Sequence, residues 1–125
     1  MANPNLASAT SVVANNAFVR LTSTTETLVV SNAASSNKVF LLDSLTVTNV
    51  DGTNACDITI NVYAAATNTG TATKLGAHTL TVPAKASVIV IGTENKTALL
   101  EGQSIYAVAS AADDLHIVGS WKELS

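Results

Sequence analysis

Charged residues are scarce in this chain of 125 residues. Asp, Glu, Lys and Arg together make up 12% of it, whereas globular domains average roughly 25%. Only six residues are Lys or Arg and the formal net charge is -3, so the clustered cations that displace counterions from phosphates are missing. Aromatic residues account for 4%, which leaves no platform on which single-stranded bases could stack. We therefore expect no nucleic-acid partner.

Cysteine and long apolar runs are also lacking. A single cysteine excludes an internal disulfide framework. No apolar run approaches the roughly 20 residues that a membrane helix requires. The opening MANPNLASATSVVANN has neither the basic start nor the apolar stretch of a secretory signal. These absences predict a protein that has no membrane partner and is made in the cytoplasm without export.

The residues that are plentiful indicate β-structure. Short β-branched runs separated by Asn, Gly, Ser and Asp recur about every ten residues, while helical periodicity is nearly absent. This spacing predicts one all-β domain, an antiparallel β-sandwich of eight to nine strands that is either jelly-roll-like or immunoglobulin-like. The polar, small-residue start predicts an N-terminal arm over residues 1–16, with the sandwich over residues 17–125. A frayed terminus is the alternative for the arm.

Alternation within the runs predicts which side chains are buried. In KVFLLDSLTVTNV the alternate positions Val39, Leu41, Leu45 and Val47 are expected on one face, which Asp43 interrupts as a bulge would. ASVIVIG is short and continuously apolar, so it is expected to be buried on both faces. In CDITINVY one side is expected to face the core and consists of Cys56, Ile58, Ile60 and Val62.

An acidic loop containing Asp51, Asn54 and Asp57 stands between two of these runs. Calcium loops place oxygen ligands at alternating positions, with glycine sixth and a bidentate glutamate twelfth. Here Gly52 directly follows Asp51 and no glutamate closes the set. The Asp-Gly step is instead typical of a turn, since glycine supplies the positive φ that hairpin turns require. We predict a hairpin-like corner without a metal, where Gly52→Val destabilises the fold and Asp51→Asn leaves assembly intact.

The remaining candidates for chemistry lack companions. Cys56 stands on the apolar side of its strand, which favours a buried, unreactive thiol over a nucleophile. His78 and His116 lack the spacing of a zinc site and are expected at the surface or rim. Asp113 and Asp114 are adjacent on a turn, where carboxylates normally point apart into water. We therefore assign no catalytic, cofactor-binding or metal-binding residue and expect no cofactor.

Trp121 and Tyr106 are the aromatic residues with the most area to bury. Trp121 shares a strand face with Leu115, Ile117 and Gly119, which predicts a buried plug at the core or its rim. If Trp121 were exposed it would instead be the leading anchor of an interface, because Trp and Tyr dominate binding hot spots. Burial is the preferred prediction, given how much apolar area the ring removes from water.

Three stretches resemble a known class of proteins. They are KVFLLDSLTVTNVDGTNACDITINVY, TVPAKASVIVI and LLEGQSIYAVASAADDLHIVGSWKELS. From Lys38 onward, the order of their strands and turns resembles small all-β virion structural proteins of tailed bacteriophages, of the capsid decoration or cement type. Such proteins resemble β-sandwich modules that sit on a capsid or tail as decoration, cement, neck or fibre-base components. The resemblance offers no active-site residues to carry over.

The resemblance implies a non-enzymatic virion structural protein located in the capsid and made in the host cytoplasm. The leading hypothesis is a cement subunit that stabilises the assembled head by bridging capsid subunits, with the major capsid protein or another virion protein as partner. Low charge fits this role, because an unpaired charge is costly to bury in an interface. A homo-oligomer is expected, and the local three-fold positions of capsid lattices favour a trimer. The alternative is a tail, neck or fibre-associated structural or adhesion sandwich, while no constellation of residues supports an enzyme.

Overall fold

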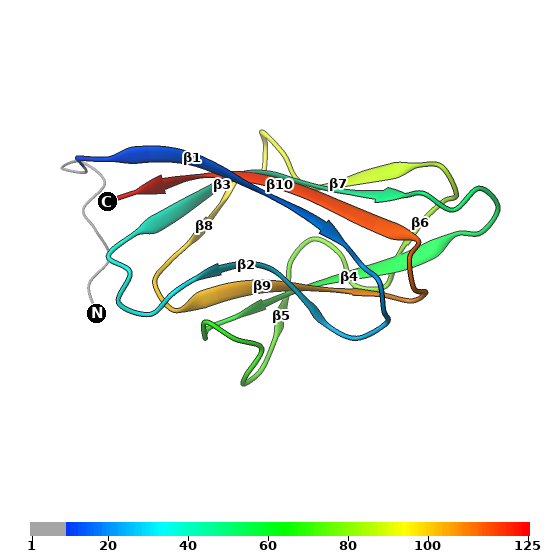
Figure 1. Cartoon of the computed structure of the whole chain (residues 1–125), viewed down its shortest axis with the longest axis horizontal. Helices are drawn as coiled ribbons and strands as arrows, with labels where there is room; N and C mark the ends of the chain where they lie inside the picture. The colour runs from blue at the N-terminus through cyan, green and yellow to red at the C-terminus, as the bar shows by residue number, and fades with distance from the viewer. Residues whose placement is uncertain (1–9) are drawn as a thin grey trace.

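The computed structural model describes residues 10–125, which form ten β-strands and no helix. Sheet A contains β1, β10, β3 and β7 in that order, with β8 also paired to β3, and sheet B contains β2, β9, β4 and β5, with β6 also paired to β4. The two sheets face each other (Figure 1). The strands are β1 (Val12–Arg20), β2 (Thr27–Asn32), β3 (Val39–Asn49), β4 (Cys56–Tyr63), β5 (Thr73–Lys74), β6 (Leu80–Val82), β7 (Ser87–Ile91), β8 (Thr97–Leu99), β9 (Gln103–Ala109) and β10 (Leu115–Leu124).

The architecture confirms the predicted all-β antiparallel sandwich. The prediction of eight to nine strands was short, because β5, β6 and β8 contain only two or three residues and cannot show a period of two. Strand pairing is nested: β1 pairs with β10, β2 with β9, β3 with β7 and β8, and β4 with β5 and β6. Successive pairs alternate between the sheets, as in a long hairpin rolled onto itself. This connectivity is jelly-roll-like rather than immunoglobulin-like. Residues 10–125 contain no helix with the length and apolar character to cross a membrane.

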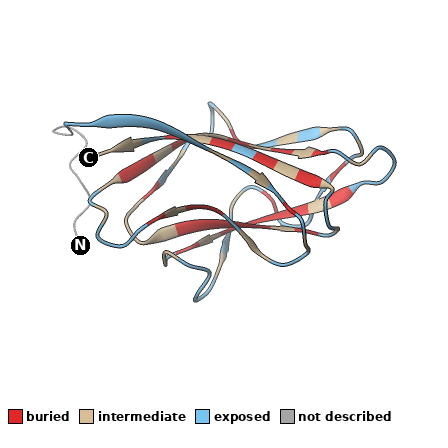
Figure 2. Ribbon diagram, viewed as in Figure 1, coloured by how far each residue is buried: buried red, intermediate tan, exposed pale blue. Residues whose placement is uncertain are grey.

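The core fills the space between the two sheets, and Figure 2 shows buried residues along strands of both. Cys56, Ile58 and Ile60 are each at most 1% exposed, which confirms the predicted core side of β4, and Val62 packs against them. Trp121 is buried as well. Period-2 alternation therefore located the central core residues of β4 and β10 correctly.

A bulge at Asp43 changes which residues of β3 reach the core. Ser120 of β10 lies opposite Ser44, but the next residue, Trp121, lies opposite Leu42, so Asp43 is an extra residue without a partner. The predicted interruption at Asp43 is thereby confirmed. The predicted face is wrong for the first half of the strand, because an extra residue reverses the alternation. The side chains that join Leu45 and Val47 in the core are Phe40 and Leu42. Leu41 is only half-buried, and Val39 is buried but does not belong to the core cluster.

The predicted arm overlaps the first strand. Residues 12–16 belong to β1 and pair with β10 from Leu124 back to Ser120. Thr10 and Ser11 also donate backbone hydrogen bonds to the carbonyl of Ser125, at 2.8 and 3.0 Å. The rest of the predicted arm, residues 1–9, lies outside the described residues. The division into an arm and a sandwich at residue 16 stays a prediction.

Two buried asparagines fasten the sheets together at strand ends. Asn49, the last residue of β3, donates through Nδ2 to the carbonyls of Asn54 (3.0 Å) and Val82 (2.9 Å), and its Oδ1 accepts from the N–H of Asp51 at 2.9 Å. Val82 belongs to sheet B, so Asn49 spans the two layers. Asn32, the last residue of β2, makes similar bonds. Its Nδ2 donates to the carbonyl of Leu99, on β8 of sheet A, and to the carbonyl of Lys38, in the loop before β3. Both asparagines are at most 1% exposed.

Candidate interaction surface

The acidic loop after β3 forms a corner between the sheets, since β3 belongs to sheet A and β4 to sheet B. Asp51 Oδ1 accepts from the N–H groups of Thr53 (2.8 Å) and Asn54 (3.3 Å). These bonds hold the pKa of the Asp51 carboxyl below its ordinary value. Asp57 instead accepts from the hydroxyl of Thr81 on β6, at 2.8 Å. The two carboxylates therefore serve separate structural bonds, and the loop is a turn built by Asp51.

The glycine in this loop does not have the positive φ that the sequence suggested. A Cβ at Gly52 would meet only Lys85 Cε at 3.6 Å, whereas Gly76 has a φ of 68° and its Cβ would lie 3.2 Å from Val90 Cγ1. We expect Gly52→Ala to change the free energy of unfolding by less than about 0.5 kcal/mol and Gly76→Ala to lower it by more than about 1 kcal/mol. Urea denaturation of both variants measures this, and a larger loss at Gly52 would contradict it.

The other candidates for chemistry do not converge on one place. Cys56 is buried, with Sγ 3.4 Å from the hydroxyl of Ser110, which confirms its place in the core. His78 is exposed and His116 is half-buried on the outer side of sheet A, as predicted. Asp113 lies in the turn before β10 at a φ of 66°. Within the described part of the chain, no three His, Cys, Asp or Glu side chains are grouped so as to hold a metal ion.

Four of the aromatic residues are buried in two ring pairs, and none of these four offers an exposed anchor. Trp121 stacks on Phe40 with ring centroids 5.9 Å apart, and Tyr106 meets Tyr63 edge-on at 5.6 Å. The indole N–H of Trp121 donates to Glu123 at 3.0 Å. Burial of Trp121, the preferred prediction, is confirmed. The alternative in which this ring anchors an interface is thereby removed.

A half-buried glutamate ties the loop after β4 to sheet B. Glu26 accepts hydrogen bonds from Asn61 (2.7 Å), the hydroxyl of Tyr63 (2.6 Å) and Asn68 (3.0 Å). Burial alone would raise the pKa of Glu26, but the bonds from Tyr63, Asn61 and Asn68, with the nearby charge of Lys74, outweigh it and lower the pKa. The hydrogen-bonding groups of Glu26 find their partners within the cluster, so the cluster has a structural role.

This cluster predicts a loss of stability in acid. A carboxyl whose pKa is lower in the folded state than its ordinary 4.5 contributes stability that is fully present above about pH 4.5 and disappears as the pH falls through the folded value. We expect the free energy of unfolding to drop below about pH 4.5, and Glu26→Gln to reduce that drop. Urea denaturation from about pH 7 to pH 3 measures it, with Glu94→Gln in the exposed β7–β8 turn as control. An unchanged acid loss in Glu26→Gln would contradict the assignment.

A small cavity inside the sandwich has no capacity for a ligand. Its volume is about 10 Å³, which corresponds to the space of roughly one water molecule. Its walls come from both sheets and are mostly apolar, among them Val29, Leu45, Ile91 and Trp121. The cavity is therefore a packing defect of the core.

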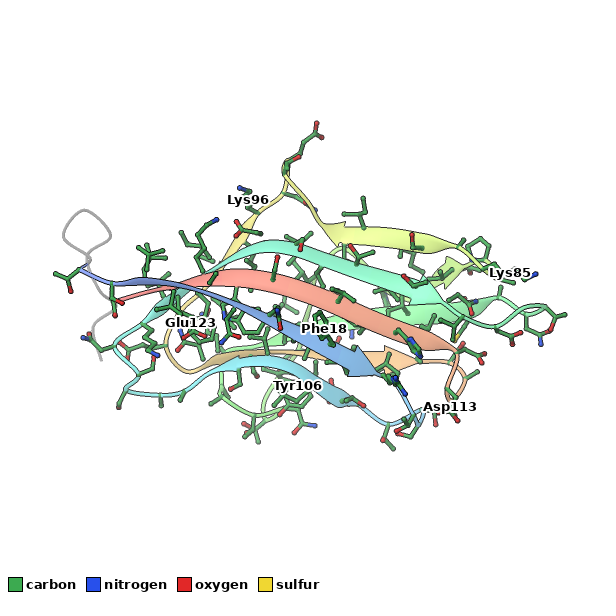
Figure 3. All side chains as sticks on the ribbon, turned by 45° about the horizontal axis from the view of Figure 1, so that its top comes forward. Phe18, Lys85, Lys96, Tyr106, Asp113 and Glu123 are labelled. Atoms are coloured by element: carbon green, nitrogen blue, oxygen red, sulfur yellow. The ribbon has the colours of Figure 1, made fainter. Side chains whose placement is uncertain are left out.

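Three exposed apolar side chains and one half-buried threonine form a row across the outer side of sheet A. Phe18 on β1 lies opposite Val118 on β10, Val118 lies opposite Thr46 on β3, and Thr46 lies opposite Ile89 on β7. Phe18, Val118 and Ile89 are 75%, 48% and 73% exposed, and Figure 3 labels Phe18 on β1. The prediction that ASVIVIG is buried on both faces is therefore wrong at Ile89. We call this row and its two neighbouring rows the A face.

The A face is almost free of charge. The three rows together contain one residue among Asp, Glu, Lys and Arg, namely Arg20, and charged groups lie beyond them. At one end of sheet A, Asp43 accepts from Lys122 at 2.7 Å and lies 3.5 Å from Lys96. Lys85 and Asp113 lie at the opposite end of the molecule from Glu123 (Figure 3). The rows are Phe18, Val118, Thr46 and Ile89; Asn16, Ser120 and Ser44; and Arg20, His116, Thr48 and Ser87.

Comparisons with known proteins show the fold. No protein-family model and no curated protein matches the chain. A chain of the disulfide-linked pili that form Bacillus endospore appendages is 16% identical, with a TM-score of 0.54 over 92% of this chain and 88% of that one. A chain of the acidic stable capsid of Helicobacter pylori bacteriophage KHP30 is 10% identical, with a TM-score of 0.51 over 94% of this chain and 90% of that one. Both matches extend over nearly the entire sandwich.

Proposed function

We propose that this chain is a non-enzymatic structural protein of a phage particle and that it acts as a cement or decoration subunit on the capsid. The observation that carries the proposal is the A face. Exposed apolar side chains that gather on one face of a protein mark an interaction site, and the centre of a protein interface is depleted of charge. Phe18, Val118 and Ile89 supply the apolar contacts, and the Ser and Thr residues between them are cheap to desolvate compared with charges.

The mechanism is mechanical. A subunit whose A face lies across two adjacent capsid subunits binds the assembled shell and not the separate capsid proteins. Binding only one state stabilises that state by mass action, so each bound copy opposes the separation of its two neighbours. A rigid sandwich suits this role, because its face is held by two ordered layers and loses little conformational freedom on binding. The partner is the major capsid protein or another protein of the head.

The number of copies in each particle tests the location. A capsid subunit occurs in hundreds of copies, in a fixed ratio to the major capsid protein, whereas a tail, neck or fibre component occurs in a small number set by tail symmetry. Gel densitometry of purified particles measures the ratio. We expect a number that matches the capsid lattice. A handful of copies would assign the protein to the tail, neck or fibre, and no copies would refute a virion role.

The arm predicted over residues 1–16 stays a proposal, in which the residues before β1 add contacts with a neighbouring subunit. Backbone groups of a polar terminal segment can extend an exposed sheet edge. Deletion of residues 2–10 is expected to lower retention on particles about tenfold while leaving the melting temperature within a few degrees. Co-sedimentation with particles that lack the protein measures retention, and equal retention of both forms would refute the arm. The trimer expected at local three-fold positions stays a prediction from lattice geometry alone, and it is an alternative to a dimer.

A further inference from the structure

The first strand, β1, is the only edge strand in residues 10–125 that is both long and regular. It has nine residues, and each pairs with β10 without a break in register. The other edges are short or irregular: β2 breaks register after Leu28, β7 has five residues and a break in its pairing with β3, and β5, β6 and β8 have two or three residues. Short, bulged strands are a usual protection against edge-to-edge association. The β1 edge has neither protection, and it contains no proline and no lysine.

The direction of the backbone groups on β1 follows from its two ends. Ser11 both donates to and accepts from Ser125, and the N–H of Leu21 donates to Leu115. Backbone hydrogen bonding alternates along an antiparallel strand, so the odd-numbered residues from Ser11 to Leu21 direct their N–H and C=O groups to β10. The even-numbered residues, Val12, Ala14, Asn16, Phe18 and Arg20, direct their N–H and C=O groups to the open edge. Among these N–H groups, that of Asn16 has a partner in the described structure, the Oδ1 of Asn15 at 2.8 Å.

The five outward-facing residues are symmetric about Asn16. We propose that two copies of this chain pair antiparallel through their β1 edges, in the register that places Asn16 opposite Asn16 of the second copy. Of the possible registers, only this one pairs all five outward residues, which gives roughly ten backbone hydrogen bonds. The carbonyl of Asn16 in the second copy replaces the Asn15 side chain that meets the Asn16 N–H in a single subunit.

Side chains and charge fit the antiparallel arrangement. Arg20 is the one charged residue of β1, and the two copies of it lie at opposite ends of the pair, whereas parallel pairing would place them side by side. On the outer side Phe18 lies over Ala14 of the second copy. On the inner side Val13 is exposed, although it points the same way as Val19, which is half-buried and packs against the core; in the pair it lies beside Val19 of the second copy. Figure 2 shows β1 exposed along most of its length.

The pairing joins the sheets A of two copies and makes their A faces continuous. It is independent of the capsid role, because it concerns two copies in solution. A dimer that fails to bind particles refutes the proposed function alone, and a monomer that binds particles refutes the pairing alone.

Charge substitution at the self-opposed residue tests both the pairing and its register. Asn16→Lys places two like charges opposite each other across the two-fold axis, and so does Asn16→Glu, while a mixture of the two variants places unlike charges there. We expect the full-length chain to sediment at about twice 12.8 kDa, each variant alone to sediment as a monomer, and the mixture to restore the dimer. Thr71→Lys, in an exposed loop, is the matched control and keeps the dimer.

A second variant protects the test against effects on folding. Ala14→Pro removes an N–H that points to the open edge and spares the bonds with β10. We expect it to be monomeric with a melting temperature close to that of the parent chain. The proposal is overturned by a parent chain that is monomeric at concentrations up to about 1 mM, by a trimer, or by a dimer that survives Ala14→Pro. A mixture of the Asn16→Lys and Asn16→Glu variants that remains monomeric would refute the register and with it the proposal.

Discussion

Replacing Asn49 with alanine is expected to lower the free energy of unfolding by about 3 kcal/mol and the melting temperature by roughly 10 °C or more. The side chain makes three hydrogen bonds to backbone groups, and it is 1% exposed. Truncation leaves the carbonyl of Val82, which belongs to the other sheet, without that donor in a place where water has little access. Each buried polar group left without a partner costs about 1 to 3 kcal/mol. Urea and thermal denaturation measure the loss.

The matched control is Asn95→Ala. The side chain of Asn95 also makes hydrogen bonds to backbone groups, to the carbonyl of Val90 at 2.8 Å and to the N–H of Gly92 at 2.6 Å, but Asn95 is exposed. Water can replace those bonds, so we expect a loss below about 1 kcal/mol. Equal losses at Asn49 and Asn95 would show that burial between the sheets contributes nothing. A destabilised Asn49→Ala chain would also lose particle binding at temperatures where it is partly unfolded.

Asn49 shows where prediction from the sequence ends. Asparagine at the end of a strand pattern is typical of a solvated turn, and no local signal separates Asn49 from exposed residues such as Asn54. Its burial is decided by Val82, a residue more than thirty positions away that reaches the same corner through the nested pairing. The sequence predicted the corner, but no local pattern could predict the hydrogen bond from Asn49 to the other sheet.

Asp43 shows a prediction that was half right. A charged residue within an apolar alternation located the bulge, because a residue without a cross-strand partner can remain at the surface. The reversal of faces was missed, since it depends on the single residue that the bulge inserts. Leu42 instead of Leu41 therefore packs with Leu45 in the core. In β4, which has no bulge, alternation predicted the core side correctly at Cys56, Ile58 and Ile60, but the opposite side is buried as well, at Thr59, Asn61 and Tyr63.

The sequence predicted that the protein has a surface suited to being covered, but not where that surface lies. The low proportion of charged residues predicted a surface suited to being covered, and three exposed apolar side chains now give that surface a position. Its apolar row is assembled from four strands, β1, β10, β3 and β7, whose register depends on pairings between distant parts of the chain. Ile89 in particular was expected inside, because a continuous apolar run does not reveal that one of its two faces is open.

Replacing Ile89 with glutamate is expected to weaken binding to particles about 100-fold, which corresponds to about 2.7 kcal/mol. Ile89 is 73% exposed in the single subunit, so the change leaves the core intact and the melting temperature within a few degrees. On a covered A face the new carboxylate would lose its water without gaining a partner, and that penalty appears only in the bound state.

The control is Leu80→Glu, at an exposed apolar residue of sheet B, for which we expect binding within about threefold of the parent. Ile89 lies on the edge of sheet A opposite to β1, so the variant should still dimerise. Equilibrium co-sedimentation with particles that lack the protein measures all three chains, and equal binding of the two glutamate variants would show that the A face is not the contact surface.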